Sequence, residues 1–305
     1  MSQLIVLGSV KADHVLQVPS FPRPGETLHG RNYQIIPGGK GANQAVAAAR
    51  LNADIGFIAC VGDDGFGQNI RGVFAVDGID ISAVHMIENT PTGIAMIQVS
   101  DCGENSICIA AAANDALTAE VVNQHCAQIA AANYLLMQLE TPLAGIEYAA
   151  SIAKANGTQV ILNPAPARAL PDALLAMVDI ITPNETEAEV LTGVAVTDAD
   201  SAAKAAQALH DKGIAIVMIT LGSKGVYISQ QGTGKIISGF KVTATDTTAA
   251  GDTFNGAFVT GLLEGKAIED AVVFAHGAAA ISVTRFGAQT SIPSRDEVEQ
   301  FITAQ

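Results

Sequence analysis

Short apolar runs rich in β-branched residues recur along the chain, separated by Ala-rich amphipathic stretches of helical length. Runs without polar alternation are typical of strands that are buried on both faces of a parallel sheet. The predicted strands are 4–7, 55–59, 134–137, 159–162, 180–182 and 214–220, and the predicted helices are 43–51, 67–77, 119–132, 143–156, 185–192 and 199–212. Alternating strands and helices predict an α/β fold in which a mainly parallel central sheet is flanked by helices, in three layers.

Two segments interrupt this alternation and predict a second, smaller sheet. Residues 14–37 are short β-like pieces with several prolines, and 92–110 alternate apolar and polar positions around a turn at 100–104, which indicates a hairpin. The main domain would then consist of 1–13, 38–91 and 111–305. Such a sheet has an apolar face that substrate, the main domain or a second subunit must cover. We interpret it as a lid, with a purely structural extension as the alternative.

The length of 305 residues fits two domains, or one large α/β domain with an appendage. Hydrophobic residues make up 49% of the chain and charged residues 15%, so the chain can build a large core and is not intrinsically disordered. The net charge of −14 repels polyanions, which argues against nucleic acid as a partner. A single nucleotide remains possible, because backbone amides at a helix N-terminus attract anions locally.

The four cysteines form no C-x-x-C pair, so we expect reduced thiols rather than a zinc site or disulfides. The longest apolar candidate, 271–283, contains His276 and Gly277 and is shorter than the roughly 20 residues that span a bilayer. The amino-terminal segment resembles a short strand rather than a signal peptide. We therefore predict a cytoplasmic protein with no membrane partner.

The segment 246–258 carries the clearest chemical signal. A loop of small residues runs into an amphipathic helix, which places Asp252 in the first helical turn beside free N–H groups. Ordinary capping explains an acidic residue at this position equally well. However, Gly251 lets a ligand approach the backbone closely. A carboxylate beside an anion-binding turn suits the transfer of an anionic group to an acceptor that must lose a proton.

A second glycine-rich segment, Gly38-Gly-Lys-Gly-Ala-Asn, opens the helix predicted at 43–51. Its glycines free backbone amides for a polar ligand, and Lys40 and Asn43 add side-chain donors. The Walker pattern G-x-x-x-x-G-K-[ST] is absent, so this is not a P-loop. A helix N-terminus without a ligand is the alternative.

Three further segments each have a structural and a functional interpretation. Asn184 and Glu187 form a capping box, or they hold a metal-bound phosphate at the carboxyl end of a strand. The segment 220–226 is either a plain turn between strands or a nucleotide contact. Asp63 and Asp64 could be metal ligands, although a solvated loop is the simpler interpretation.

Taken together and in this order, these segments resemble the ribokinase family of sugar and nucleoside kinases. The family's two signatures correspond to 38–43 and 246–258, its nucleotide-side motifs correspond to 184–187 and 220–225, and the resemblance extends over 4–293. Further segments resemble the members that phosphorylate ribose; they are 8–14, 24–27, 137–140 and 163–168.

The resemblance implies ATP-dependent phosphorylation of D-ribose at the 5-hydroxyl, with Mg²⁺ and activation by K⁺. It also implies a homodimer that pairs through the small sheets. Another sugar kinase of the same fold, acting on deoxyribose, fructose or a nucleoside, is the alternative.

The resemblance also implies a role for individual residues. Asp252 corresponds to the general base, and Ala249, Ala250 and Gly251 correspond to the anion hole. The residues that correspond to the sugar site are Lys11, Ala12, Asp13, Gly39, Lys40, Gly41, Ala42, Asn43, Glu140 and Asp252. Those that correspond to the nucleotide site are Asn184, Glu187, Thr220, Leu221, Gly222, Ser223, Lys224, Gly225, Gly251, Asp252 and His276. Those that correspond to the monovalent-cation loop are Asp246, Thr248, Ser282, Arg285, Gly287 and Ser291, mostly through backbone carbonyls.

One position departs from the pattern of the family. Lys11 stands where its ribose-phosphorylating members usually carry Asn, two residues before Asp13. Asn both donates and accepts hydrogen bonds, whereas Lys only donates. We therefore expect Lys11 to affect sugar affinity or preference.

Overall fold

The computed structural model describes residues 2–230 and 232–305. Its middle layer is a nine-stranded sheet in the order β13-β12-β11-β10-β9-β8-β1-β4-β5. All neighbours from β11 to β5 are parallel, and β12 and β13 continue the sheet in antiparallel fashion. The strands are β1 (Leu4–Leu7), β4 (Ile55–Gly62), β5 (Val84–Ile87), β8 (Tyr134–Met137), β9 (Gln159–Leu162), β10 (Ile180–Ile181), β11 (Ile216–Thr220), β12 (Val226–Gln230) and β13 (Thr233–Ile237). The predicted α/β class with a mainly parallel sheet is confirmed.

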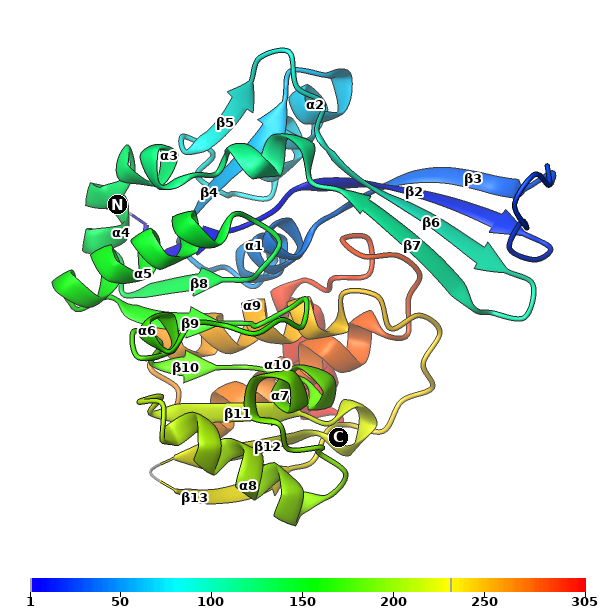
Figure 1. Ribbon diagram of the computed structural model, residues 1–305. Coiled ribbons are helices and arrows are strands. Elements are labelled where there is room, and N and C mark those ends of the chain that lie inside the picture. Colours follow the sequence, from blue (N-terminus) through cyan, green and yellow to red (C-terminus); the bar gives the residue numbers. More distant parts are fainter. Residues whose placement is uncertain (1, 231) are drawn as a thin grey trace.

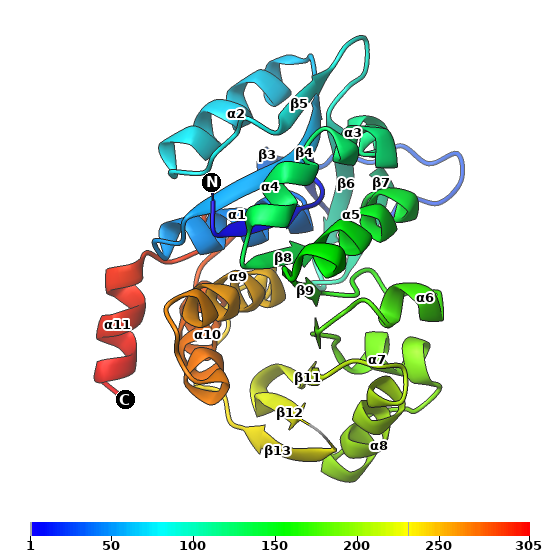
Figure 2. The same cartoon turned by 90° about the vertical axis from the view of Figure 1, so that its left-hand side faces the viewer.

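Helices cover both faces of this sheet, as Figure 2 shows. On one face lie α1 (Lys40–Arg50), α2 (Gly65–Val76), α9 (Ala250–Leu263), α10 (Ile268–Ser282) and α11 (Arg295–Thr303). On the other lie α3 (Ala119–Asn123), α4 (Cys126–Ala131), α5 (Leu143–Asn156), α6 (Asp172–Leu175), α7 (Glu185–Thr192) and α8 (Ala199–His210). Among the helices of this part of the chain, none combines the length and apolar character that crossing a membrane requires.

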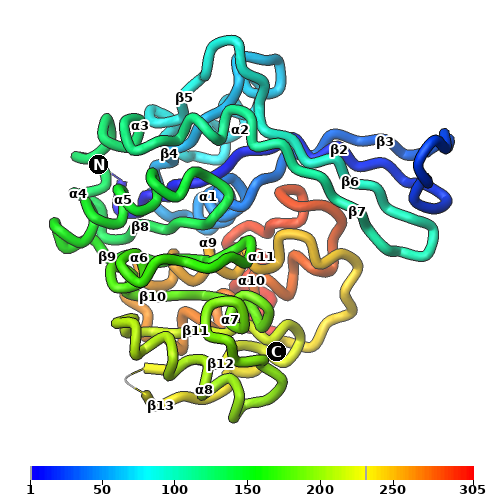
Figure 3. Tube along the Cα trace, in the orientation of Figure 1, coloured from blue at the N-terminus to red at the C-terminus, as the bar shows by residue number. Residues whose placement is uncertain are grey.

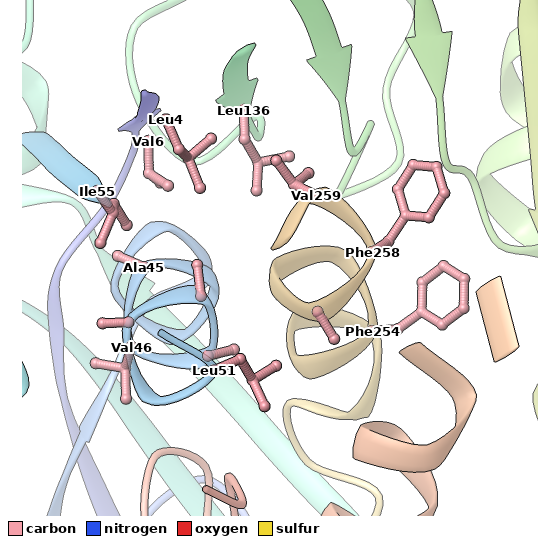
Figure 4. Close-up of a cluster of buried hydrophobic side chains, with 14 of the residues drawn as sticks. Leu4, Val6, Ala45, Val46, Leu51, Ile55, Leu136, Phe254, Phe258 and Val259 are labelled. Atoms are coloured by element: carbon pink, nitrogen blue, oxygen red, sulfur yellow. The ribbon is translucent and has the colours of Figure 1, made fainter. Parts of the chain in front are cut away.

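Alternate residues of each central strand point into two separate cores. In β1, Leu4 and Val6 pack toward α1 and α9, whereas Ile5 and Leu7 pack toward the helices of the opposite face. The close-up in Figure 4 shows α1 and α9 side by side beneath Leu4, Val6 and Leu136. Because both faces are buried, these strands appear in the sequence as uninterrupted apolar runs.

The predicted second sheet is present and projects from one side of the main body (Figures 1 and 3). Its four strands, in the order β3-β2-β6-β7, are β3 (Arg31–Gly38), β2 (Lys11–Val18), β6 (Gly93–Ser100) and β7 (Asn105–Ala110). The hairpin predicted at 92–110 corresponds to β6 and β7, which pair antiparallel. One face of this sheet carries Asp13, and strand register places Ile97, Ile107 and Ile109 on the same face.

Helices α2 and α8 differ from their predicted extents by one or two residues at an end, and two other predicted helices differ more. Helix α1 begins at Lys40 rather than 43, because Gly39 has φ 94°, a left-handed conformation that favours glycine, and ends the preceding extended segment sharply. The single helix predicted at 119–132 is interrupted at His125, where φ is −115°. Its two halves, α3 and α4, both pack on α5.

Candidate active site

The polar residues singled out in the sequence gather where the carboxyl ends of β1 and β8 meet the first turns of α1 and α9. Asp252 lies in the first turn of α9, as predicted. Asn43 lies in the first turns of α1, Glu140 follows β8, and Asp13 comes from β2 of the small sheet. The edge formed by the carboxyl ends of parallel strands is where open α/β sheets bind ligands.

The Asp252 carboxylate is held by two side-chain amides from α1. Asn43 donates to its Oδ2 at 2.9 Å, and Gln44 donates to its Oδ1 at 2.9 Å. Asp252 is only 6% exposed, and this burial raises the pKa of its carboxyl group, against the Lys40 ammonium and the two amide donors. A buried carboxylate that accepts neutral donors has the properties of a general base.

A close contact between α1 and α9 makes these hydrogen bonds possible. A Cβ atom at Gly256 would lie 2.6 Å from the backbone oxygen of Gln44 and 2.6 Å from the Cβ of Ala47. Glycine at this position therefore lets the two helices approach closely enough for residues of α1 to reach Asp252.

A second carboxylate, Glu140, is fully engaged at the sugar side of the predicted site. It accepts hydrogen bonds from Lys11 Nζ at 2.5 Å, Ser9 Oγ at 2.6 Å and the Lys40 backbone N–H at 3.0 Å. Burial raises the pKa of Glu140, but the Lys11 ammonium and these hydrogen bonds hold it below its usual value. Glu140 is therefore ionised and paired with Lys11, which is itself buried.

Asp13 is the third carboxyl group, and it faces the same space from the small sheet. Burial raises its pKa to about 6; Lys11 opposes this shift, and Glu140 and Asp252 add to it. A Cβ at the neighbouring Gly38 would lie 2.1 Å from Asp13 Oδ2, so a larger residue there would displace the carboxylate.

Backbone amides at the start of α9 form the candidate anion site. Ala249, the N-cap, has φ 58°, a left-handed conformation that is strained for a residue with a Cβ. The Ala250 N–H donates to Thr247 at 3.2 Å, so that amide is engaged. Within 2–230 and 232–305, no acceptor is found for the N–H groups of Gly251 and Asp252, and Gly251 borders open space. Of the three predicted donors, Ala250 is thus engaged, whereas Ala249 and Gly251 have no acceptor among the described residues, and Gly251 is the one that borders open space.

The predicted nucleotide segments are brought together in part. The capping box of Asn184 and Glu187 is present, with hydrogen bonds of 2.8 and 2.9 Å, and Asn184 forms a bridge with Thr220. The segment Gly222–Lys224 is a 3-10 turn after β11. Leu221, which directly precedes this turn, is buried, and Ser223 within it is exposed.

Glu187 links these segments to the rest of the site. Burial raises the pKa of Glu187; the backbone N–H of Asn184 and the Lys40 ammonium lower it, and Asp252 raises it further. Glu187 therefore lies within electrostatic range of both Lys40 and Asp252.

His276 lies inside α10, next to the backbone of Ser238, which in turn lies against Gly225 of the predicted nucleotide segment. It is 7% exposed, its ring centroid is 5.5 Å from that of Phe254, and burial lowers its pKa. Within the residues that the structure describes, no hydrogen bond joins it to 220–225.

The segments predicted to bind a monovalent cation lie against each other. Asp246 Oδ1 accepts from the Thr248 N–H and hydroxyl at 2.9 and 2.6 Å, and its Oδ2 accepts from the Gly287 N–H at 2.9 Å. Ser282 and Ser291 are buried, with their hydroxyls on local carbonyls. The Arg285 side chain pairs with Glu297 at the surface.

Several residues that hold this site together were not identified from the sequence as site residues. They are Ser9, Gln44, Gln138, Asn163, Thr182 and Asn255. Three of them could have been found from their position in the sequence. Gln138, Asn163 and Thr182 each directly follow a buried strand, where ligand-binding residues of parallel sheets lie. Asp64, considered as a metal ligand, instead caps α2 and accepts two hydrogen bonds from Thr92 at the start of β6.

Two hollows on the main sheet lie away from Asp252. The larger, of about 680 Å³, is lined by residues that include Ile216, Gln230 and Thr233, at the amino end of β11. Asp252 belongs to the opposite edge of the sheet.

Comparison with known proteins gives a consistent family. Residues 1–295 match the model of the pfkB family carbohydrate kinases. The chain is 60% identical to a ribokinase of Haemophilus influenzae over 98% of both chains, and 44% identical to a ribokinase of Staphylococcus aureus over 98% of this chain and 99% of the other. A solved structure of Arabidopsis thaliana ribokinase complexed with ribose and ATP superposes with a TM-score of 0.94 at 33% identity, covering 99% of this chain and 98% of that one.

Proposed function

The chain belongs to the pfkB family of carbohydrate kinases, and we propose that it transfers the γ-phosphoryl group of ATP to the 5-hydroxyl of D-ribose. The products are ribose 5-phosphate and ADP. The ribokinases of similar sequence and the relative complexed with ribose and ATP support this substrate pair. The observation that carries the mechanism is the Asp252 carboxylate in the first turn of α9, next to the free amide of Gly251.

Asp252 acts as the general base in this proposal. It accepts the proton of the 5-hydroxyl as the bond from O5 to the γ-phosphorus forms and the bond to the ADP oxygen breaks. General-base catalysis contributes about 10²- to 10⁴-fold to such a step. Each amide donor directed at the transferred group, Gly251 foremost, contributes on the order of 2.7–4 kcal/mol.

The sugar lies between the two domains in this proposal. Its hydroxyls are bound by Asp13 from the small sheet and by Asn43 and the backbone of Gly39 and Gly41 from the main domain. Lys11 and Glu140 form one wall as a neutral pair, and Ala12 and Ala42 complete the site.

Lys40 carries the positive charge nearest to the reacting groups. The Asp252 carboxylate raises the pKa of Lys40 more than burial lowers it, and Glu140 and Glu187 add to this effect. The protonated side chain can therefore stabilise the phosphate oxygens, and the 184–187 and 220–225 segments hold the rest of the nucleotide.

Mg²⁺ fits this site as a companion of the nucleotide. Within the residues that the structure describes, no group of three or more His, Cys, Asp or Glu side chains could hold a metal by itself. The free oxygen of Glu187 and the amide of Asn184 are placed to bind water ligands of the ion. When bound, Mg²⁺ would neutralise charge on the phosphate oxygens.

A monovalent cation fits between the segments that Asp246 joins. This carboxylate ties 246–248 to Gly287, which places carbonyl-bearing backbone from both segments beside the start of α9. K⁺ would bind there through carbonyls and stabilise the turn that presents the Gly251 amide.

The small sheet serves as a lid and as a dimer contact in this proposal. It carries Asp13 into the site, and its apolar residues continue outward on the same face. The described cysteines are free thiols, which suits a cytoplasmic enzyme.

An acceptor panel tests the proposed activity. ADP release is measured with D-ribose, 2-deoxyribose, fructose and adenosine, with and without Mg²⁺ and K⁺. We expect the highest kcat/KM with ribose, and higher activity of another acceptor would overturn the substrate assignment. Asp252→Asn should lower kcat by at least about 10²-fold while ribose binding persists; a rate near that of the wild type would remove Asp252 as the base.

A further inference from the structure

We propose that Gln44 is a positioning residue for the catalytic base, and that it fixes the orientation of the Asp252 carboxylate through a one-way chain of buried amides. This inference rests on the proposed function of Asp252. Gln44 is fully buried, and its Nε2 donates both to Asp252 Oδ1 at 2.9 Å and to Asn163 Oδ1 at 3.1 Å.

The direction of the chain is set by a backbone carbonyl, which can only accept. Asn163 Nδ2 donates to the carbonyl of Thr182 at 3.1 Å, so its Oδ1 must face Gln44. Gln44 must then present Nε2 to both Asn163 and Asp252, and its Oε1 accepts from Gln138 at 2.6 Å. A flipped Gln44 amide would place an oxygen against two acceptors, so the donor to Asp252 is fixed.

The same strand end also supports the anion-binding turn. The Thr182 hydroxyl donates to Asn255 Oδ1 at 2.7 Å, and Asn255 Nδ2 donates to the carbonyl of Gly251 at 2.8 Å. The side-chain networks that hold the base and the turn with the free amide therefore both include hydrogen bonds with Thr182, at the carboxyl end of β10.

A neutral amide suits this role better than a cation. It stabilises the ionised carboxylate through a hydrogen bond, yet a full positive charge at that distance would lower its basicity much further. Together, Gln44 on Oδ1 and Asn43 on Oδ2 define the plane of the carboxylate.

Removing the Gln44 donor should change the titration of the base as well as the rate. The charged groups that face Asp252 come from α1, β2, the segment after β8, and α7; they are Lys40, Asp13, Glu140 and Glu187. All four remain in a Gln44 variant. Because the lost hydrogen bond favoured the ionised form, the pKa of Asp252 should rise, and the acid limb of the kcat profile should move to higher pH.

The test compares Gln44→Met and Gln44→Glu with Thr158→Val. Thr158 is also buried and lies just before β9, at the end far from Asp252. Its hydroxyl lies within hydrogen-bond distance of the carbonyls of Ile129 and Ala132, so Thr158→Val controls for the loss of a buried hydrogen bond. For Gln44→Met we expect kcat about 10-fold lower, KM for ribose within about two-fold, and an acid limb at higher pH. Gln44→Glu preserves the volume and should move the limb further, because two carboxylates then face each other.

The outcomes are distinguishable from failure of the proposed function. If the wild type prefers another sugar, the pH profiles are measured with that sugar. The shift of the acid limb then still tests the role of Gln44. An acid limb that stays at the wild-type pH in both Gln44 variants, as expected for Thr158→Val, would overturn it. If Gln44→Met does not fold, as judged by circular dichroism, Gln44→Glu decides alone.

Discussion

At the scale of single residues, three carboxyl groups on the sugar side of the site differ in their surroundings. Glu140 forms an ion pair with Lys11, and Asp252 accepts hydrogen bonds from two neutral amides. Lys11 acts on Asp13 only through its charge. Their pKa values shift accordingly, downward for Glu140 and upward for the other two. Acid–base roles on one fold are set by such differences in environment.

Asp13 should make sugar binding depend on pH. Its pKa is raised to about 6 by burial, so it binds a proton below that value and loses an acceptor for sugar hydroxyls. We expect KM for ribose to rise as the pH falls through about 6. The pH dependence of kcat should instead reflect the ionisation of Asp252. Steady-state kinetics between pH 5 and 8 check this, with Asp13→Asn as a control whose KM should not vary with pH.

The same shift sets the sign of a stability effect. Between its ordinary value of 3.8 and about 6, native Asp13 holds a proton that the unfolded chain has released. The free energy of unfolding should therefore decrease as pH rises through this window, and Asp13→Asn should reduce this dependence. Urea denaturation at several pH values measures it, and equal pH slopes for both proteins would contradict the prediction.

Lys11 should stabilise the fold by compensating Glu140. Both side chains are about nine-tenths buried, so Lys11→Met leaves an unpaired buried carboxylate and should cost about 3–5 kcal/mol in unfolding free energy. The matched control is Lys235→Met, because Lys235 and Glu269 form an exposed pair worth at most about 1 kcal/mol. Urea denaturation at pH 7 compares the two, and similar losses would contradict this account.

At the scale of elements, the contact between α1 and α9 determines whether the base is formed correctly. Gln44 and Asn43 reach Asp252 only because Gly256 permits close approach of the two helices. Figure 4 shows these helices side by side. The site is thus built at a helix–helix interface as much as at the edge of the sheet.

Gly256→Ala should separate these helices. The new methyl group meets backbone atoms of α1, which cannot move aside as a flexible side chain can, so we expect a loss of about 1–3 kcal/mol in unfolding free energy and a lower kcat. Gly72→Ala in α2 is the control, since its methyl meets nothing within 4 Å and should be neutral or stabilising. Thermal unfolding and turnover of both variants check this; equal behaviour would be inconsistent with it.

Strands were easier to predict than helix starts. The bounds of β1, β8 and β9 match the apolar runs, because burial on both faces selects nothing but apolar residues. The start of α1 was missed because three glycines in four positions resemble a loop, whereas the helix begins directly after Gly39 and its first turn packs Gly41 against the backbone of Gly8 and Ser9.

At the scale of the whole molecule, the small sheet exposes apolar side chains that a monomer leaves in water. Ile107 and Ile109 are 50% and 57% exposed on the face that carries Asp13, and Met96 is 51% exposed on the opposite face. Exposed apolar surface of this kind favours association.

The proposed dimer should depend on the face that carries Asp13. The double substitution Ile107→Lys and Ile109→Lys places charges in that contact and should yield a monomer in light scattering. Met96→Lys on the opposite face should leave the dimer intact. A wild-type monomer at working concentration, or a dimer that survives the double substitution, would reject this contact.

The sequence by itself determined the α/β class, most strands and helices, the presence of a second sheet, and the place of Asp252 in a first helical turn. These features follow from the local period of apolar residues and from turn chemistry, which act over a few neighbouring positions. The tertiary structure alone decided which groups meet. Gln44 and Asp252 are 208 positions apart, and Lys11 and Glu140 are 129 apart. Such contacts arise from packing of distant elements, for which a single sequence carries no local signal.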